Sequence, residues 1–139
     1  MNNYKFSDIY IGLEQSFNKK ITSDMMNKFL EISDDINPLH LDTGYARKAG
    51  FPDRIVYGLL SSSFYSTLVG VYLPGKYCIL QGIDIHFLKP IFINDDLTIA
   101  GKVNYINEAY KQIEIKAFML NQKKIKVSRA TIKVGVMDE

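Results

Sequence analysis

The densest group of chemically capable side chains lies between residues 33 and 42, which read SDDINPLHLD. Within it, Asp35 and His40 stand five residues apart, on either side of Asn37 and Pro38. Proline disfavours helical backbone at the residue before it, and asparagine bonds nearby backbone groups, so this pair predicts a turn. A carboxylate and an imidazole that such a turn aims at one point form a minimal acid/base pair. The pair could take a proton from water and deliver one to carbon.

Two other interpretations of this segment are metal binding and a purely structural role. One histidine with a few carboxylates makes a poor ligand set for a metal ion. A segment rich in Asp, Asn and Pro can also serve only for capping and turning, which is the more common role for an arbitrary loop of this composition. Elsewhere, His86 lies among polar strand positions and Cys78 has no basic neighbour in the sequence. We expect a surface role for the first and a packing role for the second.

The composition is that of one globular domain, predicted to span residues 1–139. The chain has a mass of 15.9 kDa, with 47% apolar and 23% charged residues. It holds 17 Lys and Arg against 15 Asp and Glu, a net charge of +2. That balance is too even to require nucleic acid or an anionic membrane as partner. A single cysteine excludes a disulfide framework and a multi-cysteine zinc site.

Residues 55–75 contain no charged side chain and are long enough to span a bilayer. Serines and glycines dilute the hydropathy of this stretch, so we expect it to form a helix buried in the core instead. Residues 1–20 are polar and mixed, without the apolar segment of a cleavable signal peptide. We therefore expect a cytoplasmic protein with no membrane partner.

The first half of the chain predicts helices and a long loop. Apolar residues at helical spacing between Met25 and Leu30 predict a helix over residues 23–32. Thr22 or Ser23 can cap it. The turn-rich stretch that follows predicts a long structured loop with a short helix at 42–48, and the uncharged stretch predicts a helix over 56–72.

The second half predicts an antiparallel sheet with one buried face. Apolar and polar residues alternate over residues 79–87, 97–105 and 112–119. In the last segment the alternation changes phase, which predicts a β-bulge near Ser128–Arg129. The predicted fold class is therefore α+β, with the sheet wrapped around the uncharged helix.

The pattern S-x-D-x-N-P-L-H-x-D over residues 33–42 resembles the hydratase motif of the MaoC-like family, the (R)-specific enoyl-CoA hydratases. The similarity continues in the family's order. RIVYGLL (54–60) resembles the run into the family's central helix, LPG (73–75) the segment after it, and FLKPIFINDDL (87–97) its strand-turn-strand signature. The resemblance covers residues 20–136. It implies the hot-dog fold, in which an antiparallel sheet wraps a long central helix.

The resemblance also implies roles for individual residues. Asp35 and His40 match the catalytic aspartate and histidine of the family. Gly58 matches the glycine whose backbone N–H, at the start of the central helix, binds the thioester oxygen. Asn37 matches an asparagine that shapes the active-site loop, and Ser66 matches a serine that lines the site.

Two positions depart from the family's pattern. Asp34 stands where many members have glycine, which changes the charge of the loop but leaves the acid/base pair intact. Tyr57 stands where members usually have histidine, directly before Gly58. We expect Tyr57 to contact the substrate and reshape the pocket.

The implied activity is that of a hydro-lyase, which hydrates trans-2-enoyl-CoA reversibly to (R)-3-hydroxyacyl-CoA. Coenzyme A is part of the substrate, and no metal or other cofactor is implied. The implied assembly is a homodimer or a dimer of dimers, with the substrate tunnel at the subunit interface. Three alternatives remain open: dehydration of 3-hydroxyacyl groups on acyl carrier protein, thioester cleavage, and a non-catalytic subunit that binds acyl thioesters. Candidate contacts for the phosphates of coenzyme A are Lys89, Lys124, Arg129 and Lys133.

Overall fold

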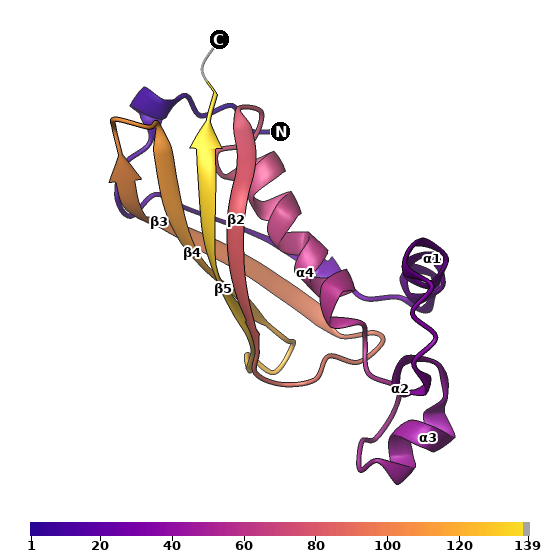
Figure 1. Cartoon of the computed structure of the whole chain (residues 1–139). Helices are drawn as coiled ribbons and strands as arrows, with labels where there is room; N and C mark the ends of the chain where they lie inside the picture. Colours follow the sequence, from indigo (N-terminus) through magenta and orange to yellow (C-terminus); the bar gives the residue numbers. More distant parts are fainter. Residues whose placement is uncertain (138–139) are drawn as a thin grey trace.

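A five-stranded antiparallel sheet curls around one helical segment in the computed structural model, which describes residues 1–137 (Figure 1). The remaining residues of the predicted domain, 138 and 139, lie outside the described part. In sheet order, the strands are β1 (Glu14–Lys20), β3 (Asp96–Asn107), β4 (Gln112–Leu120), β5 (Lys126–Val136) and β2 (Cys78–Phe87). The central helix α4 (Gly58–Thr67) continues into a π-helical turn, η2 (Leu68–Tyr72). The predicted α+β architecture is confirmed.

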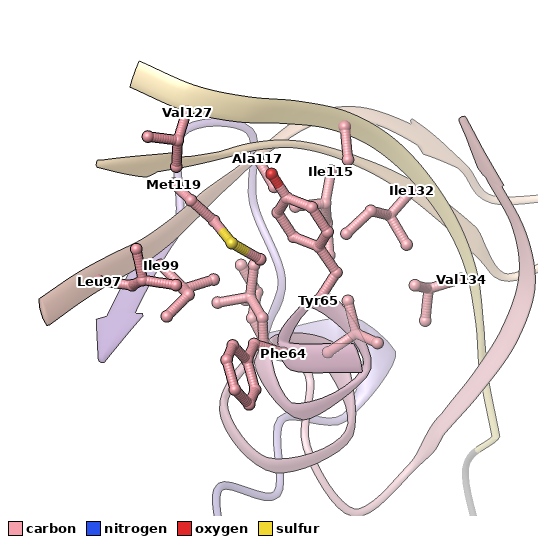
Figure 2. Packing of buried hydrophobic residues seen from close by; sticks show 14 of the residues in the cluster. Phe64, Tyr65, Leu97, Ile99, Ile115, Ala117, Met119, Val127, Ile132 and Val134 are labelled. Atoms are coloured by element: carbon pink, nitrogen blue, oxygen red, sulfur yellow. The ribbon is translucent and has the colours of Figure 1, made fainter. Parts of the chain in front are cut away.

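The core lies between α4 and the concave face of the sheet. Tyr65 and Leu68 on the helical segment are fully buried, as are the isoleucines at the centre of the sheet. Figure 2 shows the Tyr65 ring reaching from α4 toward Ala117 and Ile115 of β4. Its hydroxyl pairs with that of Ser128 on β5, and burial raises the pKa of Tyr65 to about 12. Burial on the inner face of the sheet accounts for the absence of charge in this helix.

The length and hydropathy needed to cross a bilayer are not combined in any helix of residues 1–137.

The β-bulge predicted in β5 is confirmed, one residue earlier than expected. Leu120 pairs with Lys126 while Met119 pairs with Ser128, so Val127 is the extra residue. Val127 and Ser128 are both buried, and inward positions fall on even numbers from there on. The bulge thus accounts for the change of phase in the sequence.

A second bulge, at Gln81 in β2, corrects the prediction for that strand. Leu80 pairs with Val134, but Gly82 pairs with Lys133, which leaves Gln81 unmatched. Directly paired residues share a face of the sheet, and Val134 is fully buried on the inner face. Leu80, rather than Ile79, therefore lies on the inner face with the later apolar residues of the strand.

Three helices lie beside the sheet and α4, at one end of the molecule (Figure 1). They are α1 (Ser23–Ser33), α2 (Pro38–Leu41) and α3 (Thr43–Lys48), and a short 3₁₀ turn, η1 (Phe6–Asp8), precedes β1. The helices predicted at 23–32 and 42–48 are confirmed. So is the cap, since the Thr22 hydroxyl accepts from the Met25 N–H at 3.3 Å. The single-turn helix α2 was not predicted.

Candidate active site

Asp35 lies in the loop between α1 and α2, and His40 lies on α2. Asn37 joins them. Its side-chain oxygen accepts from the Leu39 N–H at 2.9 Å and so caps α2, while its carbonyl accepts from the His40 N–H at 3.0 Å. The Asn37 N–H donates to the Asp35 carboxylate at 3.1 Å. One side-chain oxygen of Asp35 is thereby fixed, and the other is left for a substrate or water.

The orientation of the His40 ring is set by a backbone carbonyl. His40 Nδ1 lies 2.7 Å from the Ile55 oxygen. A carbonyl oxygen only accepts, so Nδ1 carries the hydrogen and Nε2 is the atom left to act on a substrate. The Ile55 N–H donates in turn to the Leu39 carbonyl at 3.1 Å. Sequence reasoning missed Ile55, because a role played by a backbone oxygen leaves no mark in residue type.

Tyr57 contacts both halves of the predicted acid/base pair. Its ring lies 4.2 Å from the His40 ring and 4.9 Å from that of Phe29, centroid to centroid. Its hydroxyl donates to the Asp35 carbonyl at 2.8 Å. The residue is only 2% exposed, and burial raises the pKa of Tyr57, with a further contribution from the nearby Asp35 charge. The hydroxyl therefore stays protonated, and its hydrogen is donated to the Asp35 carbonyl of the same chain.

Gly58 is the first residue of α4, directly after Tyr57, whose side chain does not cap the helix. The first N–H groups of a helix have no acceptor within it and lie at its positive end, so they suit an oxyanion. A Cβ at position 58 would come within 3.0 Å of two ring atoms of Phe87, at the end of β2. A side chain at position 58 would therefore push away the ring of Phe87, a residue to which sequence reasoning gave no place in the site.

Two hollows meet at His40, Gly58 and Phe87. The first, of about 530 Å³, also contains Asp35 and Tyr57. The second, of about 360 Å³, is an apolar slot that also contains the polar side chains of Lys89 and Ser61. Its apolar walls are Phe51, Ile55, Val56, Leu88, Pro90 and Ile91. The junction places acid/base groups on one side and an apolar slot on the other. Such an arrangement suits a ligand with an apolar chain and a reactive polar end.

The structure does not bring every predicted residue to this junction. Ser66 lies exposed on α4 and does not line either hollow, so its contact with substrate stays a prediction. Burial raises the pKa of the Cys78 thiol to about 11, which disfavours the reactive thiolate. His86 lies exposed on β2, 3.4 Å from Asp84. Among residues 1–137, no three His, Cys, Asp or Glu side chains gather where they could hold a metal ion.

Comparison with known proteins places the chain among hydratases and dehydratases. A family model described as "MaoC like domain" matches residues 10–126. An (R)-specific enoyl-CoA hydratase from Aeromonas caviae is 35% identical over 98 residues, which cover 70% of this chain and 73% of that protein. A mitochondrial 3-hydroxyacyl-[acyl-carrier-protein] dehydratase from Arabidopsis thaliana is 38% identical over 76 residues, 55% of this chain. The match spans only 45% of the Arabidopsis protein.

Solved structures of hydratases share the whole architecture. The unliganded R-hydratase PhaJ1 from Pseudomonas aeruginosa has a TM-score of 0.91 and 26% identity, covering 99% of this chain and 88% of its own. The (R)-hydratase from A. caviae has a TM-score of 0.87 and 28% identity, covering 92% and 97%. The sheet around α4 is therefore a hot-dog fold, as the sequence resemblance implied.

Proposed function

Since this chain belongs to the MaoC-like dehydratase family, we propose that it is an (R)-specific enoyl-CoA hydratase. This hydro-lyase adds water reversibly to trans-2-enoyl-CoA to give (R)-3-hydroxyacyl-CoA. The observation that carries the proposal is the junction of the two hollows, where His40 and Gly58 lie between the Asp35 loop and an apolar slot. Coenzyme A is part of the substrate, and the reaction needs no metal or redox cofactor. The proposed place of action is the cytoplasm.

In the proposed mechanism, Asp35 takes a proton from water as the water oxygen bonds to the β-carbon. Protonated His40, held through Nδ1–H by Ile55, delivers its Nε2 proton to the α-carbon. The carbon–carbon double bond becomes a single bond, and the proton on Asp35 returns to His40 through solvent. Negative charge that develops on the thioester oxygen is stabilised by the Gly58 N–H and the positive end of α4.

The apolar slot is the proposed site of the acyl chain. Of the four basic residues considered for the phosphates of coenzyme A, Lys89 lines this slot. Arg129 and Lys133 come from β5 and line hollows that also contain Asp84 of β2, away from the two hollows of the site. Lys89 would therefore lie beside the acyl chain, and the proposal assigns none of the four residues to the phosphates of coenzyme A.

A second candidate keeps the chemistry and changes the carrier to acyl carrier protein, as in the name of the Arabidopsis relative. The test compares kcat/KM for crotonyl-CoA, longer enoyl-CoAs and the same acyl groups on carrier protein. A hydratase removes the absorbance of the conjugated enoyl group without releasing a thiol. Release of free thiol would identify a thioesterase. Binding without any turnover would identify a non-catalytic subunit.

We further propose that two copies of the chain pair through β2, alone or within a dimer of dimers. This strand is the last in the sheet, so one of its edges is free. Apolar side chains are exposed along it and on the neighbouring start of α4: Ile83 is 40% exposed, Phe87 56% and Leu59 67%. An unpaired strand edge with exposed apolar side chains favours association with another chain. Because Phe87 also lines both hollows, a second copy here would add walls to the site.

Sedimentation equilibrium tests this assembly. We expect a mass of twice, or for a dimer of dimers four times, the 15.9 kDa of one chain. Ile83→Glu places a charge on the proposed interface, so we expect it to shift the mass toward one chain. Ile125→Glu puts the same charge on a similarly exposed isoleucine outside β2, and its mass should equal that of the wild type. A monomeric wild type would contradict the proposal.

We expect Gly58→Ala to lower turnover of crotonyl-CoA by about tenfold, because the new methyl group displaces the Phe87 ring beside the oxyanion site. The matched control is Gly70→Ala in η2, where a Cβ meets nothing within 4 Å. Steady-state kinetics of the two variants check this prediction. Equal rates for both would show that the close approach of Phe87 to Gly58 does not matter to the reaction.

A further inference from the structure

The three consecutive residues 55–57 bind three separate parts of the chain. The Ile55 carbonyl holds the His40 ring, and the Tyr57 hydroxyl holds the Asp35 carbonyl. Between them, the Val56 N–H donates to the Ile91 carbonyl at 2.8 Å, on the segment that leads into β3. Ile55 and Tyr57 hold the catalytic segment, while Val56 anchors them to the segment that leads into β3.

Asp35 depends on this anchorage more than its neighbours do. Residues 34–38 are all exposed, and the other bonds of Asp35 are local. Its N–H donates to the Ser33 hydroxyl at 3.2 Å and its carboxylate accepts from the Asn37 N–H, each only two residues away. Local bonds move with the loop. The bond from Tyr57 spans 22 residues and ties Asp35 to the start of α4.

We propose that Tyr57 is a positioning residue that fixes Asp35 and His40 relative to each other, the first through its hydroxyl and the second through its ring. The inference rests on the proposed function of the two residues as an acid/base pair. It gives a role to the position at which this chain departs from the family's pattern. It also replaces direct contact with substrate as the main role of Tyr57.

Tyr57→Phe tests the proposal because it keeps the ring on His40 and Phe29 and removes only the hydroxyl. We expect kcat for crotonyl-CoA to fall by about 10- to 100-fold, the effect of a misplaced catalytic group, with KM changed by less than about twofold. Tyr65→Phe is the matched control, because it also removes a buried, bonded hydroxyl but in the core. We expect its kcat to stay within about twofold of the wild type. An unchanged kcat in Tyr57→Phe, or equal losses in the two variants, would overturn the proposal.

A double-mutant cycle separates positioning from contact with substrate. If Tyr57 acts through Asp35, then Tyr57→Phe lowers kcat no further in an Asp35→Asn background. Losses that multiply would mean that Tyr57 acts independently of Asp35, and would contradict the inference.

Hydrogen exchange provides a readout that does not depend on activity. We expect the amides of residues 35–37 to exchange faster in Tyr57→Phe and at the wild-type rate in Tyr65→Phe. Unchanged exchange in Tyr57→Phe would overturn the positioning role. If the wild type hydrates no enoyl thioester, the proposed function fails while the exchange result still reports on the loop.

Discussion

We expect Asp35→Asn to lower turnover of crotonyl-CoA by on the order of 10²–10⁴, the usual contribution of a general base. Asparagine has nearly the same shape, and its side-chain oxygen can still accept from the Asn37 N–H that fixes the loop. An amide, however, cannot take a proton from water. The loss should therefore fall on kcat while the fold and the binding of substrate are retained, which steady-state kinetics and circular dichroism measure.

The neighbouring residue supplies a matched control for this variant. Asp34 ends α1 in the left-handed region, with φ of 55°, a conformation that asparagine tolerates well. Asp34→Asn makes the same chemical change one residue away. We expect its turnover to stay within about twofold of the wild type. Near-normal turnover in Asp35→Asn, or equal losses in the two variants, would remove Asp35 from the proposed mechanism.

His40→Ala is expected to cost a similar factor, on the order of 10²–10⁴ in kcat, because no other side chain is proposed to deliver a proton to the α-carbon. The change also removes the ring that Tyr57 packs against and the donor to the Ile55 carbonyl. His40→Gln therefore serves as a second variant, since it keeps bulk and a donor but cannot transfer a proton. Both variants should show the loss in single-turnover measurements of enoyl absorbance.

Two further observations separate chemistry from packing at His40. His86→Ala removes the other histidine, which is 54% exposed at its side chain on β2, and we expect turnover within about twofold of the wild type. Added imidazole should partly restore turnover in His40→Ala, where a cavity remains. If His40→Gln kept near-normal turnover, the proton would have to come from elsewhere.

Much of the fold could be predicted because it depends on patterns that residue types reveal. The uncharged stretch at 56–72 predicted a buried helix, and alternation predicted β2 to β5, although not β1. The helix cap at Thr22 and the turn at Asn37 are equally local, since a short polar side chain meets a backbone group a few residues away. The motif over residues 33–42 placed Asp35 and His40 in one candidate site, and the structure brings both to one hollow.

What the sequence did not reveal depends on contacts between distant parts of the chain or on backbone groups. Every residue offers the same carbonyl, so nothing in the letters marks the Ile55 oxygen as the partner of His40. The bulge at Gln81 is hidden because both residues before it, Ile79 and Leu80, are apolar, so the alternation fits either phase. The contact between Phe87 and Gly58 joins the end of β2 to the start of α4, so it depends on how the sheet packs against the helix.

The predicted buried face of β2 is a related case. Alternation correctly marks Ile83 and Phe87 as one face, but both are substantially exposed in the single chain. The strand lies at the edge of the sheet, where α4 of the same chain covers them only in part. Apolar patterning predicts that a face of a strand is buried. It does not indicate whether the residues that bury this face belong to the same chain or to a second one.

The most direct test of the central claim is the fate of crotonyl-CoA in the presence of the wild-type protein. The proposed mechanism predicts loss of the enoyl absorbance, with stoichiometric formation of (R)-3-hydroxybutyryl-CoA and no free thiol. The (R) configuration requires that water reach one face of the double bond only, as a fixed Asp35 demands. An (S) or racemic product would contradict the claim. So would a protein that binds enoyl-CoA but converts neither crotonyl-CoA nor longer or carrier-bound enoyl substrates.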